Sequence, residues 1–511
     1  MRFIRIIFLI VMAFQTFAQG GWKKKYFFQN DSFSVAYNSI ETPTGDFIIV
    51  GLTSDTADNY SPNRLTLIGT DHNGNLLWKK SYGDSTTRYA NISNNNVFDN
   101  SGFYQTVSLG EISLLIKFNY NGDTLWQKKY YANYPSDYLT IMNLTRSVDG
   151  GFLMTGVYDG VFMLDERCLV MKTDKFGNEL WRKISGIVNV NSIIGHSIIQ
   201  DSATKTIIVT GSTFDINNSC GWLNRYSYIR FMDSLGTLKF VTSYNKDNGG
   251  GPFNKVIQLK DGNFLTGGEN VTMGPIYTSP FLVKFDIQGN VIWFREYRDT
   301  SEYNHIDHFY ELPNNDIVVT SLFDNNYYFR KLLYVRLNKD GWIKEKKYIG
   351  TPNFQDTLSN YNSEKATSLH PTKDGGFILT TSFPSINVFW NTENHPYSVI
   401  KLDANGCDTA LSACSQNLYV NIQESNLGIE PDLSIYPNPS AEILNIEANI
   451  YFSNKFEIVI QDLQGKTLDR YNIHNGSKLS INTSIYPPGL YIVQLESEGK
   501  RLSSKKLSIY R

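Results

Sequence analysis

A short pattern of apolar and polar positions recurs along the first four-fifths of the chain. It is clearest from Cys168 to Ser185, where the apolar strand Leu169–Lys172 precedes the turn Asp174–Asn178 and a second strand, Leu180–Lys183, follows. Seven copies align on the turn glycine, at Gly74, Gly122, Gly177, Gly236, Gly289, Gly341 and Gly406. Successive copies lie 48, 55, 59, 53, 52 and 65 residues apart. Self-similarity at a nearly constant spacing indicates a repeat architecture.

The turn has the same chemistry in every copy. Three residues before the glycine stands a short polar side chain, at Asp71, Asn119, Asp174, Asp233, Asp286, Asn338 and Asp403. Such a side chain bonds the backbone two residues on, and glycine accepts φ > 0, so the segment predicts a tight hairpin. A calcium loop is the alternative, but one acidic residue per turn supplies too few oxygen ligands. The turn is therefore expected to be structural.

A large aromatic ring follows the turn glycine by four residues in five copies, at Trp78, Trp126, Trp181, Phe240 and Trp293. A ring at one fixed place in each unit most simply packs between neighbouring sheets. If Trp181 is buried there, Trp181→Ala should cost roughly 3–5 kcal/mol. Copies six and seven carry Glu345 and Ala410 instead.

Each repeat unit contains further strand signals before its hairpin. Apolar runs lie at 45–51, 149–156, 261–264 and 374–379, and a shorter run such as Ser197–Gln200 precedes several of them. Each unit thus predicts four short strands, which is one blade of a β-propeller.

The N-terminal segment Trp22–Tyr26 matches the outgoing strands but has no incoming strand of its own. The seventh copy is its complement, because it lacks an aromatic outgoing strand. We expect the N-terminal strand to complete the last blade, which removes an exposed sheet edge. The prediction is an all-β fold with a seven-bladed β-propeller over residues 19–421, followed by a small C-terminal β-sandwich.

The C-terminal part of the chain has a different pattern. The repeat ends after Val420, residues 422–432 form a linker, and 433–511 show alternating apolar residues between Gly and Pro turns, typical of a small β-sandwich. Three motifs occur in order, Tyr436-Pro437-Asn438-Pro439, Asp462 to Lys466 with Gly465, and Pro488-Gly489-Leu490-Tyr491. Together they resemble the type A C-terminal sorting domain of the type IX secretion system of Bacteroidetes. The resemblance implies recognition by the type IX machinery, export, and release or attachment at the cell surface.

The repeat resembles the tryptophan-containing blades of pyrroloquinoline-quinone-type propellers, in which a Gly turn precedes a Leu-Trp strand. That motif also packs blades in cofactor-free relatives. The chain has no adjacent cysteine pair like that of the quinone enzymes. No cofactor is therefore expected.

Composition and the N-terminus bear on location and partners. Residues 1–18 combine Arg2 and Arg5 with an apolar core and a small-residue cleavage site, which predicts a signal peptide and a secreted or surface-attached protein. No later run reaches transmembrane length. The net charge of −2 gives no field that would attract nucleic acid.

The four cysteines have no metal-type spacing. In an exported protein, Cys407 and Cys414 are close enough to close a small loop by disulfide. Whether Cys168 and Cys220 form a second disulfide stays open.

Two functions remain open. Long, irregular connections on one face predict a ligand surface for glycan or protein, with aromatic residues at Trp222, Tyr226, Tyr277, Tyr327, Tyr328, Tyr361 and Trp390. This favours a non-catalytic binding or adhesion module. The rival is a hydrolase of surface glycans, because 147–152 and 372–377 resemble part of the Asp-box of sialidase-like propellers. No catalytic or metal-binding residue can be named, since no zinc, phosphate-loop or nucleophile motif occurs.

Overall fold

The computed structural model describes most of the chain outside its N-terminal segment and several connections. The described residues are 20–28, 33–54, 63–83, 89–93, 95, 97–134, 137–159, 166–185, 191–215, 225–244, 251–272, 277–297, 303–324, 330–349, 365–382, 396–408, 432–449, 456–473, 478–497 and 500–510. The predicted signal peptide, 1–18, and most of the predicted linker lie outside them.

The described strands before residue 409 form seven antiparallel sheets, numbered here in chain order. Sheet 1 contains β2 (Phe33–Glu41), β3 (Phe47–Ser54), β4 (Asn63–Thr70) and β5 (Leu76–Tyr82). Sheet 2 contains β6 (Ala90–Ile92), β7 (Val97–Asp99), β8 (Gly102–Ser108), β9 (Ile112–Phe118) and β10 (Thr124–Tyr131). Sheet 3 contains β11 (Tyr138–Arg146), β12 (Phe152–Asp159), β13 (Arg167–Thr173) and β14 (Glu179–Ser185). Sheet 4 contains β15 (Asn191–Gln200), β16 (Ile207–Asp215), β17 (Arg225–Met232) and β18 (Leu238–Tyr244).

Three more sheets continue the series. Sheet 5 contains β19 (Lys255–Gln258), β20 (Phe264–Thr272), β21 (Tyr277–Phe285) and β22 (Val291–Glu296). Sheet 6 contains β23 (Tyr303–Glu311), β24 (Ile317–Asp324), β25 (Arg330–Leu337) and β26 (Ile343–Ile349). Sheet 7 contains β27 (Lys365–Pro371), β28 (Phe377–Ser382), β29 (Tyr397–Leu402) and β1 (Trp22–Tyr26).

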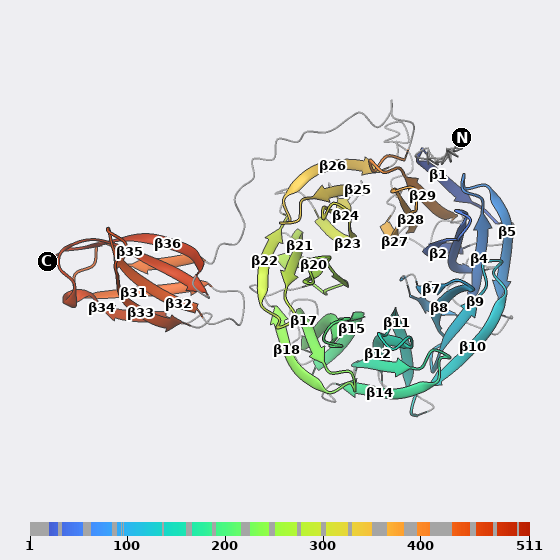
Figure 1. Ribbon diagram of the computed structural model, residues 1–511, viewed down its shortest axis with the longest axis horizontal. Helices are drawn as coiled ribbons and strands as arrows, with labels where there is room; N and C mark the ends of the chain where they lie inside the picture. Colours follow the sequence, from blue (N-terminus) through green and yellow to red (C-terminus); the bar gives the residue numbers. More distant parts are fainter. Residues whose placement is uncertain are drawn as a thin grey trace, which may run out of the picture.

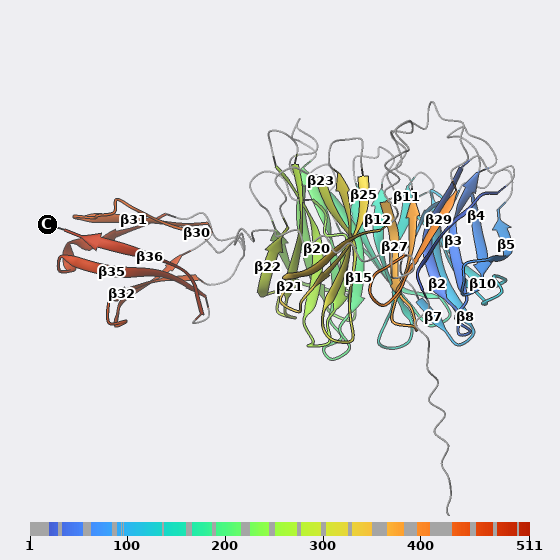
Figure 2. The same ribbon diagram turned by 90° about the horizontal axis from the view of Figure 1, so that it is seen from above.

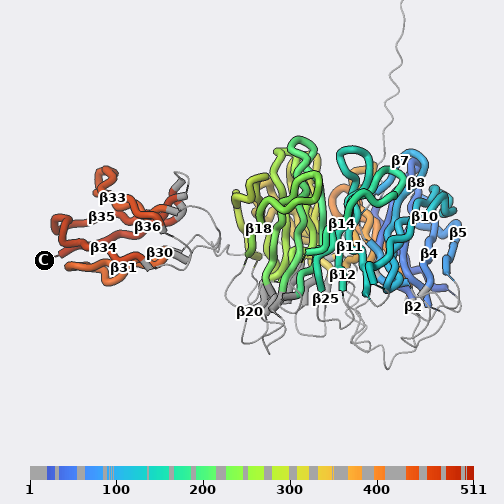
Figure 3. The backbone as a smooth tube through the Cα atoms, turned by 90° about the horizontal axis from the view of Figure 1, so that it is seen from below, coloured from blue at the N-terminus to red at the C-terminus, as the bar shows by residue number. Residues whose placement is uncertain are grey.

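The sheets are arranged around a ring, with the first strand of each sheet innermost and the last outermost (Figure 1). The turns that join first to second strands, and third to fourth strands, lie together at one end of the ring (Figures 2 and 3). We call this end the short-turn face. The fold is all-β, and its four-stranded sheets fit a propeller.

The outer strand of sheet 7 comes from the other end of the chain. β1 pairs antiparallel with β29, with Trp22 opposite Lys401 and Tyr26 opposite Tyr397. In the other sheets the outer strand follows the third strand directly through the Gly turn. The last sheet therefore combines the first and last strands of the ring.

Apolar cores lie between successive sheets. In the described residues each ring core combines two neighbouring sheets, from sheets 1 and 2 round to sheets 7 and 1. The last of these brings Tyr26, Phe47 and Tyr397 together. The middle strands are buried on both sides, as in β3 and β8, because every sheet is covered by two neighbours. This explains their continuous apolar sequences.

The C-terminal part forms two further sheets. One contains β30 (Asp432–Tyr436), β31 (Ile443–Asn449) and β34 (Lys478–Asn482), and the other contains β32 (Phe456–Asp462), β33 (Thr467–Ile473), β35 (Gly489–Ser497) and β36 (Lys500–Ile509). A single 3-10 turn, η1 (Thr483–Ile485), follows β34. Leu433, Ile446, Ile458 and Leu495 belong to a core made only of residues from this part.

None of the helical segments in the described ranges is long and apolar enough to span a membrane.

Candidate functional site

The repeated aromatic ring sits on the turn glycine of the next sheet. A Cβ added to Gly236, in the turn of sheet 4, would lie 2.8 Å from the Trp181 ring of sheet 3. The same contact recurs at 2.7 to 3.2 Å for the pairs Trp22/Gly74, Trp78/Gly122, Trp126/Gly177, Phe240/Gly289 and Trp293/Gly341. Each ring therefore packs directly on a backbone that has no side chain.

A tyrosine four residues after the ring completes this contact. The hydroxyls of Tyr26, Tyr130 and Tyr297 donate at 2.8 Å to the carbonyl oxygens of Gly74, Gly177 and Gly341. Tyr82 donates likewise to the carbonyl of Gly122. The repeated glycine thus receives a ring and a hydroxyl from the preceding sheet. We call this arrangement the outer clasp.

Sheet 6 makes the clasp with a residue that the sequence pattern does not reveal. Its outer strand carries Glu345 where other sheets carry the ring. The Tyr334 ring, from β25, lies instead against Gly406, 2.6 Å from a Cβ placed there. Tyr334 is fully buried. In sheet 6 the ring that packs on the glycine therefore comes from the third strand and not from the fourth. The tyrosine on the third strand is the only sequence feature that could have indicated this.

The turns between first and second strands carry repeated ion pairs. Lys117 Nζ lies 2.9 Å from Asp99, and Lys401 Nζ lies 2.7 Å from Asp374. Arg336 is 2.8 Å from Asp316 in sheet 6. The same positions in sheets 3 and 5 pair Lys172 with Asp149 and Lys284 with Asp261. In sheets 1 and 4 the place of the Lys or Arg is taken by Gly69 and Phe231. No such ion pair is present in these two sheets among the described residues.

These pairs hold the turn carboxylates ionised. Burial raises the pKa of Asp374, but the hydrogen bonds from Lys401, Thr372 and the Gly376 N–H, with the positive charge of Lys401, together outweigh it, and the pKa lies below its usual value. Burial is also outweighed at Asp149, where hydrogen bonds from Lys172 and Ser147 lower the pKa. Asp149 and Asp374 belong to the two segments that resemble part of an Asp-box. Both segments join a first strand to a second strand, and their side chains stabilise the turn.

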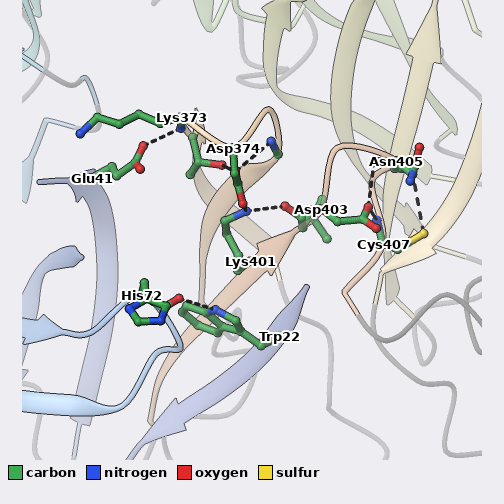
Figure 4. Close-up of polar contacts among 12 residues, drawn as sticks. Trp22, Glu41, His72, Lys373, Asp374, Lys401, Asp403, Asn405 and Cys407 are labelled. Carbon is green, nitrogen blue, oxygen red and sulfur yellow. Dashed lines mark hydrogen bonds and ion pairs between the residues drawn. The ribbon is translucent and has the colours of Figure 1, made fainter. Parts of the chain in front are cut away.

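Glu41 is a carboxylate whose pKa burial raises. It ends β2 and accepts a hydrogen bond at 2.8 Å from the backbone N–H of Lys373, beside Asp374 (Figure 4). Glu311 accepts in the same way from the N–H of Lys260, and Gln200 does so from Val148 at 2.8 Å. Because a glutamine fills the same position in sheet 4, the position needs an acceptor and not an acid.

A second set of hydrogen bonds joins neighbouring sheets near the middle of the ring. Three residues before the end of the first strand, sheets 1 and 3 to 7 carry Asn38, Asn143, Ser197, Lys255, His308 and Ser368, and in sheet 2 Asn95 lies just before β7. Asn95 Nδ2 donates to Asn143 Oδ1 at 3.0 Å. Asn143 Oδ1 accepts from the N–H of Ile198, and Ser197 Oγ from that of Val256, both at 3.2 Å.

The chain closes this inner set between sheets 7 and 1. His370 Nε2 lies 2.8 Å from Asn38 Oδ1, and Thr367 Oγ1 donates to the carbonyl of Ala36. Lys255, in sheet 5, is the exception. Burial lowers its pKa to about 8, and its ammonium has no hydrogen-bond or ion-pair partner in the described part of the chain.

Few residues of the predicted ligand surface can be placed. Trp222, Tyr327, Tyr328, Tyr361 and Trp390 lie outside the described residues. Tyr226 lies at the start of β17, opposite Thr213, and is partly buried. Tyr277 begins β21. Both strand ends lie at the end of the ring opposite the short-turn face. Because most residues of the predicted surface are not described, the surface stays a prediction.

The cysteines divide into two kinds. Cys168 is a free, buried thiol, so the alternative Cys168–Cys220 pair is wrong. Its sulfur lies 4.0 Å from Thr155 Oγ1 and 3.9 Å from the carbonyl oxygen of Leu169. Cys407 is disulfide-bonded, and Cys414 lies outside the described residues, so the Cys407–Cys414 pairing stays a prediction.

The three C-terminal motifs converge at one end of their sheets. Asn438 Nδ2 donates to the carbonyl of Lys506, and Asn438 Oδ1 accepts from the N–H of Ser508. Tyr491 pairs with both Leu507 and Asp462. The first motif therefore lies on the end of β36, and the other two on the strands beside it.

Each motif has a local structural reason. Asp462 Oδ1 accepts from the N–H groups of Gln464 and Lys466, and Gly465 has φ +84°, which makes a tight turn. Tyr491 is buried and its hydroxyl donates to the carbonyl of Pro487. Pro437 and Pro439 follow cis peptide bonds. The exposed residues of this end include Tyr436, Pro437, Pro439, Lys466, Pro488 and Gly489.

The described residues contain no group of three or more His, Cys, Asp or Glu side chains that could hold a metal ion.

Residues 434–510 match the family described as the secretion system C-terminal sorting domain. This confirms the predicted sorting domain, which implies export by type IX secretion. No curated protein is significantly similar to the chain.

Several solved structures share parts of the fold at low similarity. A PL25 ulvan lyase bound to -[GlcA(1-4)Rha3S]- has 10% identity and a TM-score of 0.45 over 75% of this chain and 96% of its own. A protein of unknown function from Dyadobacter fermentans DSM 18053 has 12% identity and a TM-score of 0.39 over 75% and 99%. A GH43 β-1,3-galactosidase with galactodeoxynojirimycin has 9% identity and a TM-score of 0.32 over 57% and 95%. None of these likenesses is strong enough to transfer a function.

Proposed function

We propose that this chain is a type IX-exported binding or adhesion protein. In this proposal residues 1–18 direct it to the periplasm, a seven-bladed propeller closed by β1 displays the binding surface, and the C-terminal sandwich delivers it to the cell surface or the medium. The observation that carries the proposal is the sorting-domain match over residues 434–510. A protein that is exported to the cell surface or the medium is exposed to glycans and proteins, which are therefore its candidate ligands.

The described turn carboxylates of the short-turn face do not suit a glycosidase. A glycosidase needs one carboxylic acid that is protonated at working pH and a second that is ionised. Asp99, Asp149, Asp261, Asp316 and Asp374 have pKa values below their ordinary range and are paired with Lys or Arg. Glu41 has a raised pKa, but its role is repeated by Gln200.

The ligand surface in this proposal is the face opposite the short turns. It takes glycans or proteins through the aromatic residues of its connections, including Trp222, Trp390 and Tyr226. Aromatic rings stack on sugar rings and on apolar protein side chains. No cofactor, metal ion or nucleic acid enters the proposal.

A glycan array and a hydrolysis assay on the same glycans test this function. We expect retained glycans without product formation, and weaker retention by Tyr226→Ala. Phe176→Ala is the matched control, because Phe176 is an exposed aromatic residue on the short-turn face. Turnover without stable binding would replace the proposal with the glycan hydrolase.

A further inference from the structure

The last strand of each ring sheet has one edge that pairs with no other described strand. These strands form the outside of the ring (Figure 1). A strand edge that presents unpaired backbone groups is a template for another strand, and charged side chains, lysine above all, are the usual protection against such pairing. The charges on the outer strands therefore decide which of these edges are protected.

The residue directly after the clasp ring, or after Glu345 in sheet 6, differs between the outer strands. It is charged in four of them and polar in a fifth, at Lys23, Lys79, Arg182, Lys346 and Gln127. In β22 it is Phe294, which is 6% exposed and belongs to the core between sheets 4 and 5. In β18 it is Val241, which is 46% exposed. Sheet 4 thus carries an exposed apolar side chain where four other sheets carry a cation.

The rest of β18 is also apolar and nearly uncharged. Leu238 and Phe240 are exposed as well. Its one charged residue is Lys239, whose ammonium donates at 3.3 Å to Thr206 Oγ1, just before β16 of the same sheet. The strand therefore combines an apolar surface with an edge that charges do not protect.

The sequence of β18 is complementary to itself. Val241 is the central residue of Leu238–Tyr244. Two copies of the strand that pair antiparallel about Val241 place Lys239 opposite Ser243, so no like charges meet. The central residue of β5, β14 and β26 is the cation that follows the ring position. The same pairing there would set that cation against its own copy, which is destabilising.

We propose that β18 is a dimer interface, in which two copies of this chain pair antiparallel through their β18 strands about Val241. The pairing joins the two copies of sheet 4 into one continuous sheet. Burial of Leu238, Phe240 and Val241 drives the association. Both copies use the same strand, so the contact closes at two copies. Because the interface is one strand wide, the dimer dissociates on dilution. The interface does not depend on the ligand surface of the proposed function.

Sedimentation velocity of the purified protein over a range of concentrations tests the interface. We expect dimers that dissociate on dilution. Val241→Lys sets two like charges against each other and should leave monomers where the natural protein is dimeric, at an unchanged Tm. Gln127→Lys is the matched control, because it adds the same charge at the equivalent position of β10, and it should keep the dimer. A natural protein that is monomeric at every concentration, or an equal loss of dimer in both variants, would overturn the proposal.

Changes at Ser243 test the register of the pairing. Ser243 is exposed, and in the dimer it lies opposite Lys239 of the other copy. Ser243→Glu should therefore strengthen the dimer several-fold, and Ser243→Lys should weaken it. Equal dimer affinities of these two variants would contradict pairing about Val241.

A disulfide cross-link gives a direct readout. Opposite residues of an antiparallel pair have Cα atoms about 4.5–5.5 Å apart, which a disulfide can span. We expect Val241→Cys to form a covalent dimer on mild oxidation, which a reductant reverses, and Gln127→Cys to stay monomeric on the same gel. The natural protein is run beside them, because it has cysteines of its own. Cross-linking of both variants to the same extent, or of neither, would overturn the interface.

Discussion

The turn glycine of each repeat meets two requirements at once. Gly236 has φ +80°, which L side chains rarely adopt, and its bare Cα receives the Trp181 ring of the preceding sheet. The ring itself is only partly buried. Trp181→Ala should therefore cost about 1–3 kcal/mol, less than the value for a fully buried ring.

Two glycines separate the backbone requirement from the packing requirement. Gly262 has φ +85°, but nothing lies within 4 Å of a Cβ placed on it. We expect Gly262→Ala to cost about 1 kcal/mol from backbone strain alone. Gly236→Ala should cost about 1–3 kcal/mol more, because the new methyl group displaces the Trp181 ring. Denaturant unfolding of both variants measures the difference.

The same comparison in a Trp181→Ala background checks the cause. There the two glycine variants should cost nearly the same, since the ring is gone. An undiminished penalty for Gly236→Ala in that background would show that the ring contact is not its source.

The Asp374–Lys401 pair allows a test of the repeated ion pairs. Lys401 is almost fully buried, and its ammonium lies 2.7 Å from Asp374. Asp374→Asn leaves that ammonium without its counter-charge, so we expect a loss of about 2–4 kcal/mol on chemical denaturation. Asp46→Asn is the control, because the basic position in sheet 1 is Gly69. A cost at Asp46 as large as that at Asp374 would contradict a role for the pair.

The stability contributed by this pair should depend on acid pH. The folded state holds the pKa of Asp374 below its ordinary value, so the unfolded chain takes up the proton first as pH falls. The contribution is complete above about pH 4–5 and disappears as pH falls through the lower, folded pKa. The difference in unfolding free energy between the natural protein and Asp374→Asn should therefore shrink steadily below about pH 4. A difference that stays constant down to pH 2 would exclude the carboxylate charge as its origin.

At the scale of strands, the spacing of the repeat was sufficient to predict the hairpins. The turn Asp174–Asn178 joins β13 to β14 where the polar and apolar pattern places it, because Asp, Gly and alternation are local signals. Tyr334 could not be predicted, since its ring fills the place of a missing tryptophan from a different strand. The exceptional position of Lys255 could not be predicted either. It is recognised only by comparison with the hydrogen bonds that Asn143 and Ser197 make at the equivalent position in other sheets.

β1 is the element on which ring closure depends. Its Trp22 donates to the carbonyl of His72 in sheet 1 at 3.1 Å (Figure 4). Tyr26 donates to the carbonyl of Gly74, also in sheet 1. Gly21 lies against the carbonyl of Cys407, in the turn that follows β29 of sheet 7. The strand thus contacts both sheets that must meet.

Deletion of residues 20–28 should expose the edge of β29 and loosen the contact between sheets 7 and 1. We expect a lower Tm and concentration-dependent association, because an unpaired strand edge recruits other strands. A synthetic peptide of residues 20–28 should bind the shortened protein and restore a monomer, measured by light scattering. A peptide with Trp22 and Tyr26 replaced by alanine is the control. An unchanged Tm and a monomeric state after the deletion would contradict this role of β1.

The whole molecule combines two sets of apolar cores that share no residue. The sorting-domain core consists of residues such as Leu433, Ile458 and Leu495, and the ring cores consist only of residues before position 403. Apolar burial is the main favourable contribution to folding. Each part should therefore fold without the other, and removing one should change delivery and not the structure of the rest.

Two truncations test this division. A protein ending at residue 431 should show the same ring unfolding temperature as the full chain, within about 2 °C, since no core residue is lost. In a bacterium with type IX secretion, that protein should stay in the periplasm, whereas a fluorescent protein fused to residues 432–511 should reach the surface or medium. Asp462→Ala in the fusion removes the turn acceptor for Gln464 and Lys466, and should reduce export. Glu457→Ala, which removes a partly buried carboxylate of β32 away from this turn, should not. Export of the truncated ring at the full-chain level would contradict the sorting role, and a large fall in its Tm would contradict the independence of the two cores.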